Sequence, residues 1–492
     1  MDSAPLVRWP EDEDDYILGS RNASPSKTVF IKACQESKKL WYLAGPSILI
    51  AVFQFGLFAV TQTFSGQLSA VDLGAVAMGN LVISGIGYGF LMGMGSALET
   101  LCGQAFGAGQ LHMLGIYMQR SWIILGVTAV LITPVFIFAG PILRLLGQTA
   151  AVSEVAGKFS IWIIPQLFAY GFNFPIQKFL QSQSKVIVMA WISAACLVIH
   201  IFLSWLCVLK LGWGLAGAAI TLNVSFWLLV IMQIIYIVSG SCPGAWTGFS
   251  WLAFKDLSGF IKLSMASAIM LCLEYWFVMI IILLVGHLKY NAELEVAATA
   301  ICLNLDGWII QVPIGFMAAV SVRVSNELGA GRPNAAKFSV IVTVLTSLTV
   351  GIFFMLLILT TRTIFPILFT SDPRVMAEVS KISSFLALTI ILNSVQPVLS
   401  GVAVGAGWQA IVSYINIGCY FLVGLTSAAL LGYKFNFGVM GIWGGMLLGF
   451  VAQMIILSIV TFRTDWNKEA SLAQERVSTW EKSSRAPTEE TI

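Results

Sequence analysis

The chain has 492 residues, of which 58% are hydrophobic and only 10% are charged, whereas a soluble protein has about 25% charged residues. This composition predicts an all-α protein that crosses a membrane many times. The net charge is only +3 and the basic residues are scattered, so no nucleic-acid partner is expected. The eight cysteines form no CxxC pair, and neither a disulfide framework nor a metal site is predicted.

Twelve runs are long enough to cross a bilayer, since a helix needs about 20 mostly apolar residues to do so. The predicted spans are 41–64, 76–98, 119–140, 156–177, 187–209, 214–239, 263–286, 297–320, 338–360, 380–402, 411–432 and 438–461. Residues 1–40 and 462–492 are polar tails. With an even number of spans the tails share one side of the membrane. The basic residues that flank the first and last spans predict that this side is the cytoplasm.

In the first half of the chain, the polar residues of three spans stand out. Gln54 lies within the first span. Asn173, in the fourth span, precedes Pro175, which kinks the helix; the asparagine either lines a cavity or caps its own kink. Glu99 lies at the predicted cytoplasmic end of the second span, and a role in a gate is expected there.

Two acidic residues lie within spans of the second half. Glu274 is the one charge in the seventh span, and a carboxylate at membrane depth costs roughly 2.5 to 3.5 kcal/mol on insertion scales, so it usually serves a function. We expect Glu274 to be a proton-coupling site. Asp306, in the eighth span, either faces Glu274 as a second proton-coupling group or is satisfied by neighbours such as Asn304.

Other polar and aromatic residues of the central spans are candidates to line a substrate cavity. The tryptophans and the tyrosine are alternatively packing residues or part of the aromatic belt at the membrane interface, and Asn393, which precedes Pro397, alternatively caps its own kink. The set consists of Gln54, Asn173, Tyr275, Trp276, Trp308, Gln311 and Asn393.

The chain contains an internal repeat. Residues 77–109 match residues 299–331 at an offset of 222, and the glycine-rich turns at their ends coincide. The repeat predicts two pseudo-symmetric lobes of six helices that cross the membrane in the same direction. The predicted parts are an N-terminal tail (1–40), an N-lobe (41–239), a cytoplasmic linker (240–262), a C-lobe (263–461) and a C-terminal tail (462–492). Gln54 is the neutral counterpart of Glu274.

Several long motifs are typical of one family of transporters. They include GSALETLCGQAFGAGQ (95–110), ASAIMLCLEYW (266–276), SVRVSNELGAGRP (321–333) and LNSVQPVLSGVAVGAGWQ (392–409). In these motifs the chain resembles the plant branch of the multidrug and toxic compound extrusion (MATE) family. The glycine-rich ends are interpreted as tight turns, with Arg323 and Arg332 near the surface.

The resemblance implies a V-shaped fold of twelve helices and secondary antiport of organic solutes against protons, with Glu274 as the acidic residue of the family's CLExW motif. Many relatives have a second acidic residue on the tenth helix, where this chain has Asn393. An anion channel or uniporter on the same fold therefore remains the alternative.

The expected partners are small organic substrates, protons and the lipid bilayer. We expect a monomer in the vacuolar or plasma membrane, with no enzymatic activity and no cofactor beyond the proton gradient.

Overall fold

The computed structural model describes residues 25–255, 257–286 and 292–484, and every regular element in these ranges is a helix, as predicted. Segments labelled η are short π-helical or 3₁₀-helical turns. The first half contains α2 (Pro25–Gly66), α3 (Ala70–Met78), η1 (Gly79–Ser84), α4 (Gly85–Gly107), α5 (Leu111–Ile137), α6 (Ala139–Leu145), α7 (Ala150–Trp162), α8 (Ile164–Ser182), α9 (Val186–Ser204), η2 (Trp205–Lys210), α10 (Gly214–Tyr236), η3 (Ile237–Ser241) and η4 (Trp251–Phe254). The second half contains α11 (Leu257–Gly286), α12 (Ala292–Ile309), α13 (Gln311–Gly329), α14 (Pro333–Thr361), η5 (Phe365–Leu368), α15 (Pro373–Ala406), α16 (Gln409–Asn416), η6 (Ile417–Leu425), α17 (Thr426–Ala429), η7 (Leu430–Lys434), α18 (Gly438–Arg463) and α19 (Trp466–Ser484).

Within the described ranges, 11 helical runs are long and apolar enough to cross a membrane, and they coincide with predicted spans. The remaining prediction, the fourth span at 156–177, falls on α7 and α8, which are separated at Ile163. Pro165 in the first turn of α8 explains the break, because proline lacks the N–H group that a continuous helix needs.

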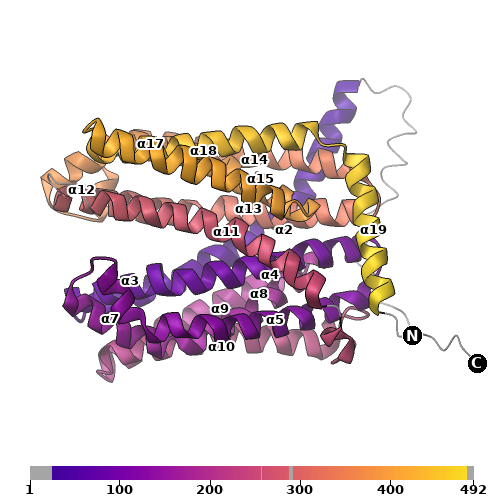
Figure 1. Ribbon diagram of the computed structural model, residues 1–492, viewed down its shortest axis with the longest axis horizontal. Helices are drawn as coiled ribbons and strands as arrows, with labels where there is room; N and C mark the ends of the chain where they lie inside the picture. The colour runs from indigo at the N-terminus through magenta and orange to yellow at the C-terminus, as the bar shows by residue number, and fades with distance from the viewer. Residues whose placement is uncertain (1–24, 256, 287–291, 485–492) are drawn as a thin grey trace, which may run out of the picture.

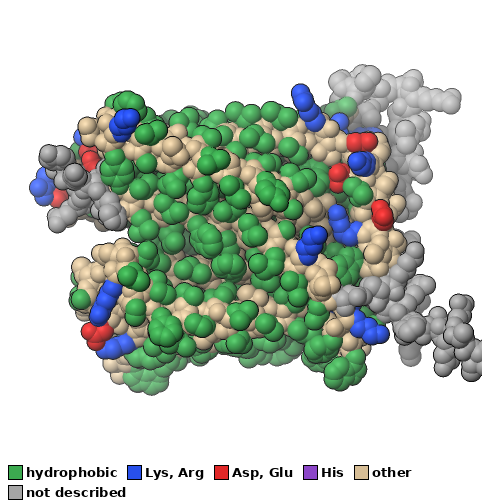
Figure 2. Space-filling view, viewed as in Figure 1, with side chains coloured by type: hydrophobic (Ala, Val, Ile, Leu, Met, Phe, Trp, Pro, Cys, Tyr) green, Lys and Arg blue, Asp and Glu red, His purple; other side chains and the backbone are tan. Residues whose placement is uncertain are grey.

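The helices form two groups that lie side by side, and α19 lies across one end of both groups (Figure 1). Charged side chains gather at the two ends of the molecule, while hydrophobic side chains cover the middle (Figure 2), as expected for a protein surrounded by lipid. We call the end that carries α19 the α19 face. At the opposite end the two groups separate, and the surface is notched between them (Figure 2).

The first helix packs against both lobes. Leu40 and Leu43, before Pro46 in α2, are buried in a cluster formed mainly by C-lobe residues. Ile50 and Leu57, after the proline, are buried in the core of the N-lobe. The helix thus leaves one lobe for the other close to Pro46.

The seventh helix makes the reciprocal crossing. Phe260 and Ala268 of α11 are buried in the N-lobe core, whereas Phe277 is buried in the C-lobe. The change of core occurs close to residues 263–267, which the repeat aligns with residues 43–47 of α2. Each lobe therefore holds the beginning of the other lobe's first helix.

Glycines allow these crossings to be close. A Cβ atom added to Gly93 of α4 would lie 2.6 Å from the Cα atom of Ala268, and one added to Gly315 of α13 would lie 2.7 Å from the backbone nitrogen of Ile48. The two glycines are repeat equivalents, and so are their two partners. The paired contacts are what a pseudo-twofold axis between the lobes requires.

At the α19 face the lobes are in direct contact. Cβ atoms added to Gly107 and Gly329 would meet the carbonyl oxygens of Asn326 and Gln104 respectively, so α4 and α13 touch backbone to backbone. The Gln104 side chain donates a hydrogen bond to the carbonyl oxygen of Gly405 (3.2 Å), which joins α4 to α15. This face of the molecule is therefore closed.

The predicted linker is held by α5. The Gln119 side chain donates to the carbonyl oxygen of Gly248 (3.0 Å) and accepts from the backbone N–H of Ser250 (2.8 Å). Phe249 and Trp251 are each 86% exposed, as suits an aromatic segment at a membrane interface. The structure begins α11 at Leu257, earlier than the predicted start at 263.

Candidate functional site

Glu274 of α11 is half-buried and accepts hydrogen bonds from three other helices of the C-lobe. All of the bonds recorded for it reach the same oxygen, Oε1. The donors are Gln396 Nε2 (3.1 Å) and Ser400 Oγ (3.3 Å) of α15, Asn416 Nδ2 (3.4 Å) of α16 and Gln453 Nε2 (3.5 Å) of α18. Among the described residues none donates a hydrogen bond to Oε2, so this oxygen is the one available to solvent or substrate.

A second layer of hydrogen bonds fixes the donors around Glu274. The Tyr420 hydroxyl donates to Gln453 Oε1 (2.6 Å) and accepts from Gln396 Nε2 (3.2 Å). Gln453 Nε2 also donates to Asn416 Oδ1 (2.7 Å). The Tyr420 ring stacks on Phe277, with 4.8 Å between ring centroids. The amides are therefore oriented before any ligand binds.

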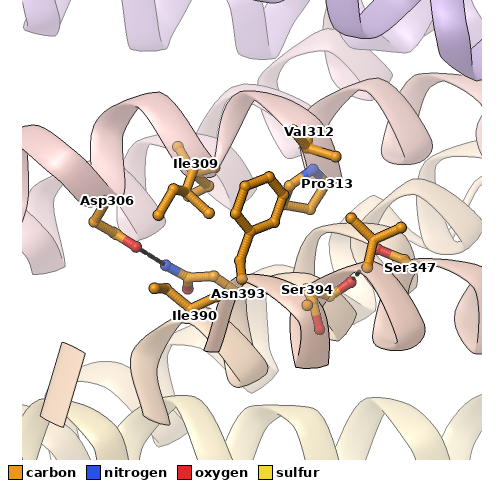
Figure 3. Close-up of a pocket in the computed structure, with 12 residues that line it drawn as sticks. Asp306, Ile309, Val312, Pro313, Ser347, Ile390, Asn393 and Ser394 are labelled. Carbon is orange, nitrogen blue, oxygen red and sulfur yellow. Dashed lines mark hydrogen bonds between the residues drawn. The ribbon is translucent and has the colours of Figure 1, made fainter. Parts of the chain in front are cut away.

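Asp306 of α12 is also half-buried, and it pairs with Asn393 of α15. Asn393 Nδ2 donates to both carboxylate oxygens, at 3.2 and 3.4 Å. Figure 3 shows the two side chains facing each other beside Ile309 and Ile390. They line a cavity of about 10 Å³, which is close to the space that one water molecule occupies.

One helix, α15, serves both acids. Asn393 bonds Asp306, and Gln396 and Ser400, three and seven residues later, bond Glu274. This spacing places all three side chains on one face of a helix. Pro397 lies among them and leaves the carbonyl of Asn393 without its helical hydrogen-bond partner, which favours a kink between the two acids.

Neither acid has a cationic partner among the described residues, whose ion pairs all involve other carboxylates. Glu274 is instead surrounded by amides and hydroxyls, which have both donor and acceptor atoms. Such groups can bond a carboxylate as donors and a protonated carboxyl as acceptors. The site can therefore hold Glu274 in either protonation state.

The aromatic candidates lie where the lobes meet. Tyr275, which is 41% exposed, contacts Tyr88 of α4, with ring centroids 6.0 Å apart. Trp308 packs edge-on against Phe55 of α2, at 4.8 Å. The structure thus places these two predicted cavity residues against the opposite lobe. The partners Tyr88 and Phe55 were not predicted, and nothing in a single sequence indicates such pairs.

The remaining candidates have different surroundings. Gln54 of α2 is half-buried, and its side-chain nitrogen has no hydrogen-bond partner among the described residues. Asn173 accepts a hydrogen bond from Gln233 of α10 (3.2 Å) within the N-lobe. The Gln311 side chain donates to the carbonyl oxygen of Gly307 in the preceding turn (2.6 Å). This bond gives a backbone carbonyl next to the break between α12 and α13 a hydrogen-bond partner.

Glu99, the predicted gate residue, forms an ion pair within the N-lobe. Its Oε2 atom lies 2.7 Å from Lys178 Nζ of α8, and its side chain is only 2% exposed. This pair joins α4 to α8 and does not bridge the lobes.

A buried ion-pair network at the α19 face was not predicted. Arg323 of α13 binds both carboxylate oxygens of Glu36 in α2, at 2.9 and 3.0 Å, and also pairs with Glu327 (2.9 Å). The expectation that Arg323 lies near the surface is wrong, because it is 5% exposed. The i,i+4 spacing of Arg323 and Glu327 could have indicated this pair.

Comparison with known proteins places the chain among transporters. A family model described as MatE matches residues 46–206 and 266–430, one range in each lobe. Protein DETOXIFICATION 33 of Arabidopsis thaliana is 57% identical over 95% of this chain and 96% of its own length. The crystal structure of the eukaryotic MATE transporter AtDTX14 superposes with a TM-score of 0.87 at 35% identity, over 90% of this chain and 99% of that one. The MATE transporter VcmN of Vibrio cholerae, in its bent form, superposes at 0.73 and 17% identity, over 91% of this chain and 99% of its own, and so shares the fold.

Proposed function

Because the chain belongs to the MATE family of membrane transporters, we propose that it is a secondary antiporter that moves organic solutes out of the cytoplasm in exchange for protons. Glu274 and Asp306 are the proton-coupling groups in this proposal. The observation that carries it is the pair of half-buried carboxylates along one face of α15, each bonded only by neutral side chains.

The coupling follows from competition at Glu274. A carboxylate at membrane depth is costly, and protonation removes that cost. A substrate that places a hydrogen-bond donor on Oε2 favours the charged form instead. Proton and substrate then bind in turn, which is the condition for exchange.

The substrate cavity in this proposal lies between the lobes, next to Glu274. Tyr275 and Trp308 supply aromatic surfaces there, and Gln54 supplies a half-buried amide whose nitrogen has no hydrogen-bond partner among the described residues. These groups suit flat organic molecules that carry hydroxyl or carbonyl groups. We place the α19 face in the cytoplasm of a monomer in the vacuolar or plasma membrane, and assign the protein no enzymatic step.

The test is uptake into acid-loaded proteoliposomes, with a flavonoid, an organic acid and chloride as separate probes. Uptake of one organic probe should follow the pH gradient and stop when a protonophore is added. Glu274→Gln should abolish the gradient-driven part. Glu154→Gln is the matched control, because Glu154 is an exposed acid paired with Lys158 at the molecular surface.

Gradient-driven uptake that persists in Glu274→Gln would refute the assignment of Glu274. The channel alternative predicts a different result, namely chloride currents that flow without a proton gradient. Electrical recording on planar bilayers measures them directly.

A further inference from the structure

The helix α19 follows the last span and connects the two lobes at the α19 face. Figure 1 shows it running across the ends of the other helices rather than along them. Its two ends pack against different lobes, and the contacts at each end are distinct.

The first part of α19 is anchored to the C-lobe. Trp466 packs on Trp408, with ring centroids 5.9 Å apart, and is only 6% exposed. Ala470 and Ala473, one and two turns later, are buried in the same cluster as the core residues of α13 and α15. This part of the helix therefore moves with the C-lobe.

The second part of α19 is anchored to the N-lobe. The Trp480 ring lies 6.2 Å from Tyr117 of α5, and the guanidinium carbon of Arg120 lies 5.5 Å from the Trp480 ring. Phe260, which belongs to the N-lobe core, also contacts Trp480, at 6.4 Å. Aromatic pairs and cation–π contacts each contribute to holding this end in place.

Arg476 connects both lobes between these anchors. Its Nη1 atom donates to Gln104 Oε1 of α4 (2.7 Å). Its guanidinium packs on Gly407 at the end of α15, where a Cβ atom added to the glycine would lie 2.8 to 3.0 Å from it. Gln104 is also bonded to Gly405, so a single chain of contacts runs from α19 through α4 to α15.

A cavity of about 280 Å³ lies beneath the middle of α19. It is lined by the two glycine-rich turns of the repeat and by three residues of α19, namely Gln474, Val477 and Ser478. The helix therefore spans a hollow between its anchors. The N-lobe end is held mainly by the partly buried Trp480 ring, which packs against the surface of the N-lobe core.

We propose that α19 is a strap that keeps the α19 face closed and releases its N-lobe end, at Trp480 and Arg476, each time this face opens. The inference rests on the proposed exchange cycle, in which both faces open in turn. Trp466 is a buried member of its core cluster, whereas Trp480 is only partly buried against the N-lobe core, so the strap pivots on Trp466 and detaches at Trp480.

The test measures access to the seam between the lobes, with no substrate and no gradient. Ser325 of α13 is fully buried against Gly103 of α4 at the α19 face. The protein is prepared with Cys34→Ser and Ser325→Cys in lipid nanodiscs, and the rate of reaction with a water-soluble maleimide is measured by mass spectrometry. Trp480→Ala should raise this rate about tenfold, because it removes the aromatic and cation–π contacts of the N-lobe anchor.

Leu472→Ala is the matched control, since Leu472 lies on the same helix, is 39% exposed and should leave the rate unchanged. Arg476→Met is the second variant, and it should raise the rate even if Trp480→Ala fails to fold. An unchanged rate in folded Trp480→Ala or in folded Arg476→Met overturns the strap. Since the assay involves no protons or substrate, failure of the proposed proton coupling would leave its outcome unaffected.

Discussion

Asp306 and Asn393 place a carboxylate and an amide opposite each other on α12 and α15. The two side chains have nearly the same shape, but only the aspartate can carry a charge. In this chain the charged member of the pair lies on α12 and the neutral member on α15. If the charge at this position is what matters, its location on one helix or the other should be of little consequence.

Exchanging the two residues tests this point. Asp306→Asn should remove most gradient-driven uptake, because the cavity then contains two neutral amides. The double variant Asp306→Asn with Asn393→Asp should restore most of it, since the pair and its hydrogen bonds are re-formed with the charge on α15. The measurement is proteoliposome uptake. A double variant as inactive as the single one would show that Asp306 acts through something other than its charge in this pair.

Sequence reasoning identified the two acids and Asn393, but neither the pairing of Asn393 with Asp306 nor the groups that bond Glu274. Glu274 stood out because a lone charge in an apolar span is costly. Asn416 and Gln453 are also polar residues within apolar spans, and the same signal, applied to amides, would have singled them out. That they converge on Glu274 could not be predicted, because they lie more than 140 residues further along the chain and only the tertiary packing brings them together.

At the scale of helices, α15 connects the two acids through the segment that contains Pro397. Asn393 lies before Pro397 and Ser400 after it, so any change of the bend alters one hydrogen bond relative to the other. The local geometry of α15 at Pro397 therefore sets the relative position of the two carboxylates.

Replacing Pro397 with alanine should straighten α15. The midpoint of thermal unfolding should stay the same or rise, because alanine restores a helical hydrogen bond. Gradient-driven uptake should fall several-fold, since Asn393 and Ser400, on opposite sides of residue 397, no longer meet their acids together. Pro134→Ala in α5 is the control, because Pro134 also lies inside a membrane-spanning helix but contacts neither acid. Normal uptake by Pro397→Ala would show that the kink is not needed.

Helices were easier to predict than their interruptions. Hydrophobic runs indicate where a span lies. They do not indicate the breaks at Ile163 and Ile310, which are caused by prolines that lie two and three residues further along the chain. The helical character of α19 was missed as well. Residues 462–492 were predicted only as a polar tail, because their composition is charged and the buried faces of Trp466 and Trp480 become apparent only against the lobes.

At the scale of the whole molecule, the lobes meet at glycines that leave no room for a side chain. Gly93→Ala should destabilise the protein by about 1 to 3 kcal/mol, because the added methyl group overlaps the backbone of Ala268. Gly126→Ala is the control, since a Cβ atom at Gly126 meets nothing within 4 Å. Thermal unfolding in detergent measures both. Equal midpoints for the two variants would contradict a close crossing at Gly93.

The orientation of the molecule can be measured with a native side chain. Cys34, near the start of α2, is exposed, whereas the other seven cysteines are buried. In sealed vesicles whose cytoplasmic side faces outward, a membrane-impermeant maleimide should label the protein, and Cys34→Ser should not be labelled. Labelling only after the vesicles are opened would place the α19 face on the other side of the membrane.

The crossing of α2 between the lobes has a consequence for how the protein is made. Glu36 and Arg323 are separated by 287 residues, so the ribosome must complete the whole N-lobe and begin the C-lobe before the first helix meets its partner. Until then the beginning of α2 has inserted without the surface that later buries Leu40 and Leu43. The N-terminal half cannot mature as a finished unit during synthesis, and its assembly must wait for the C-terminal half to emerge.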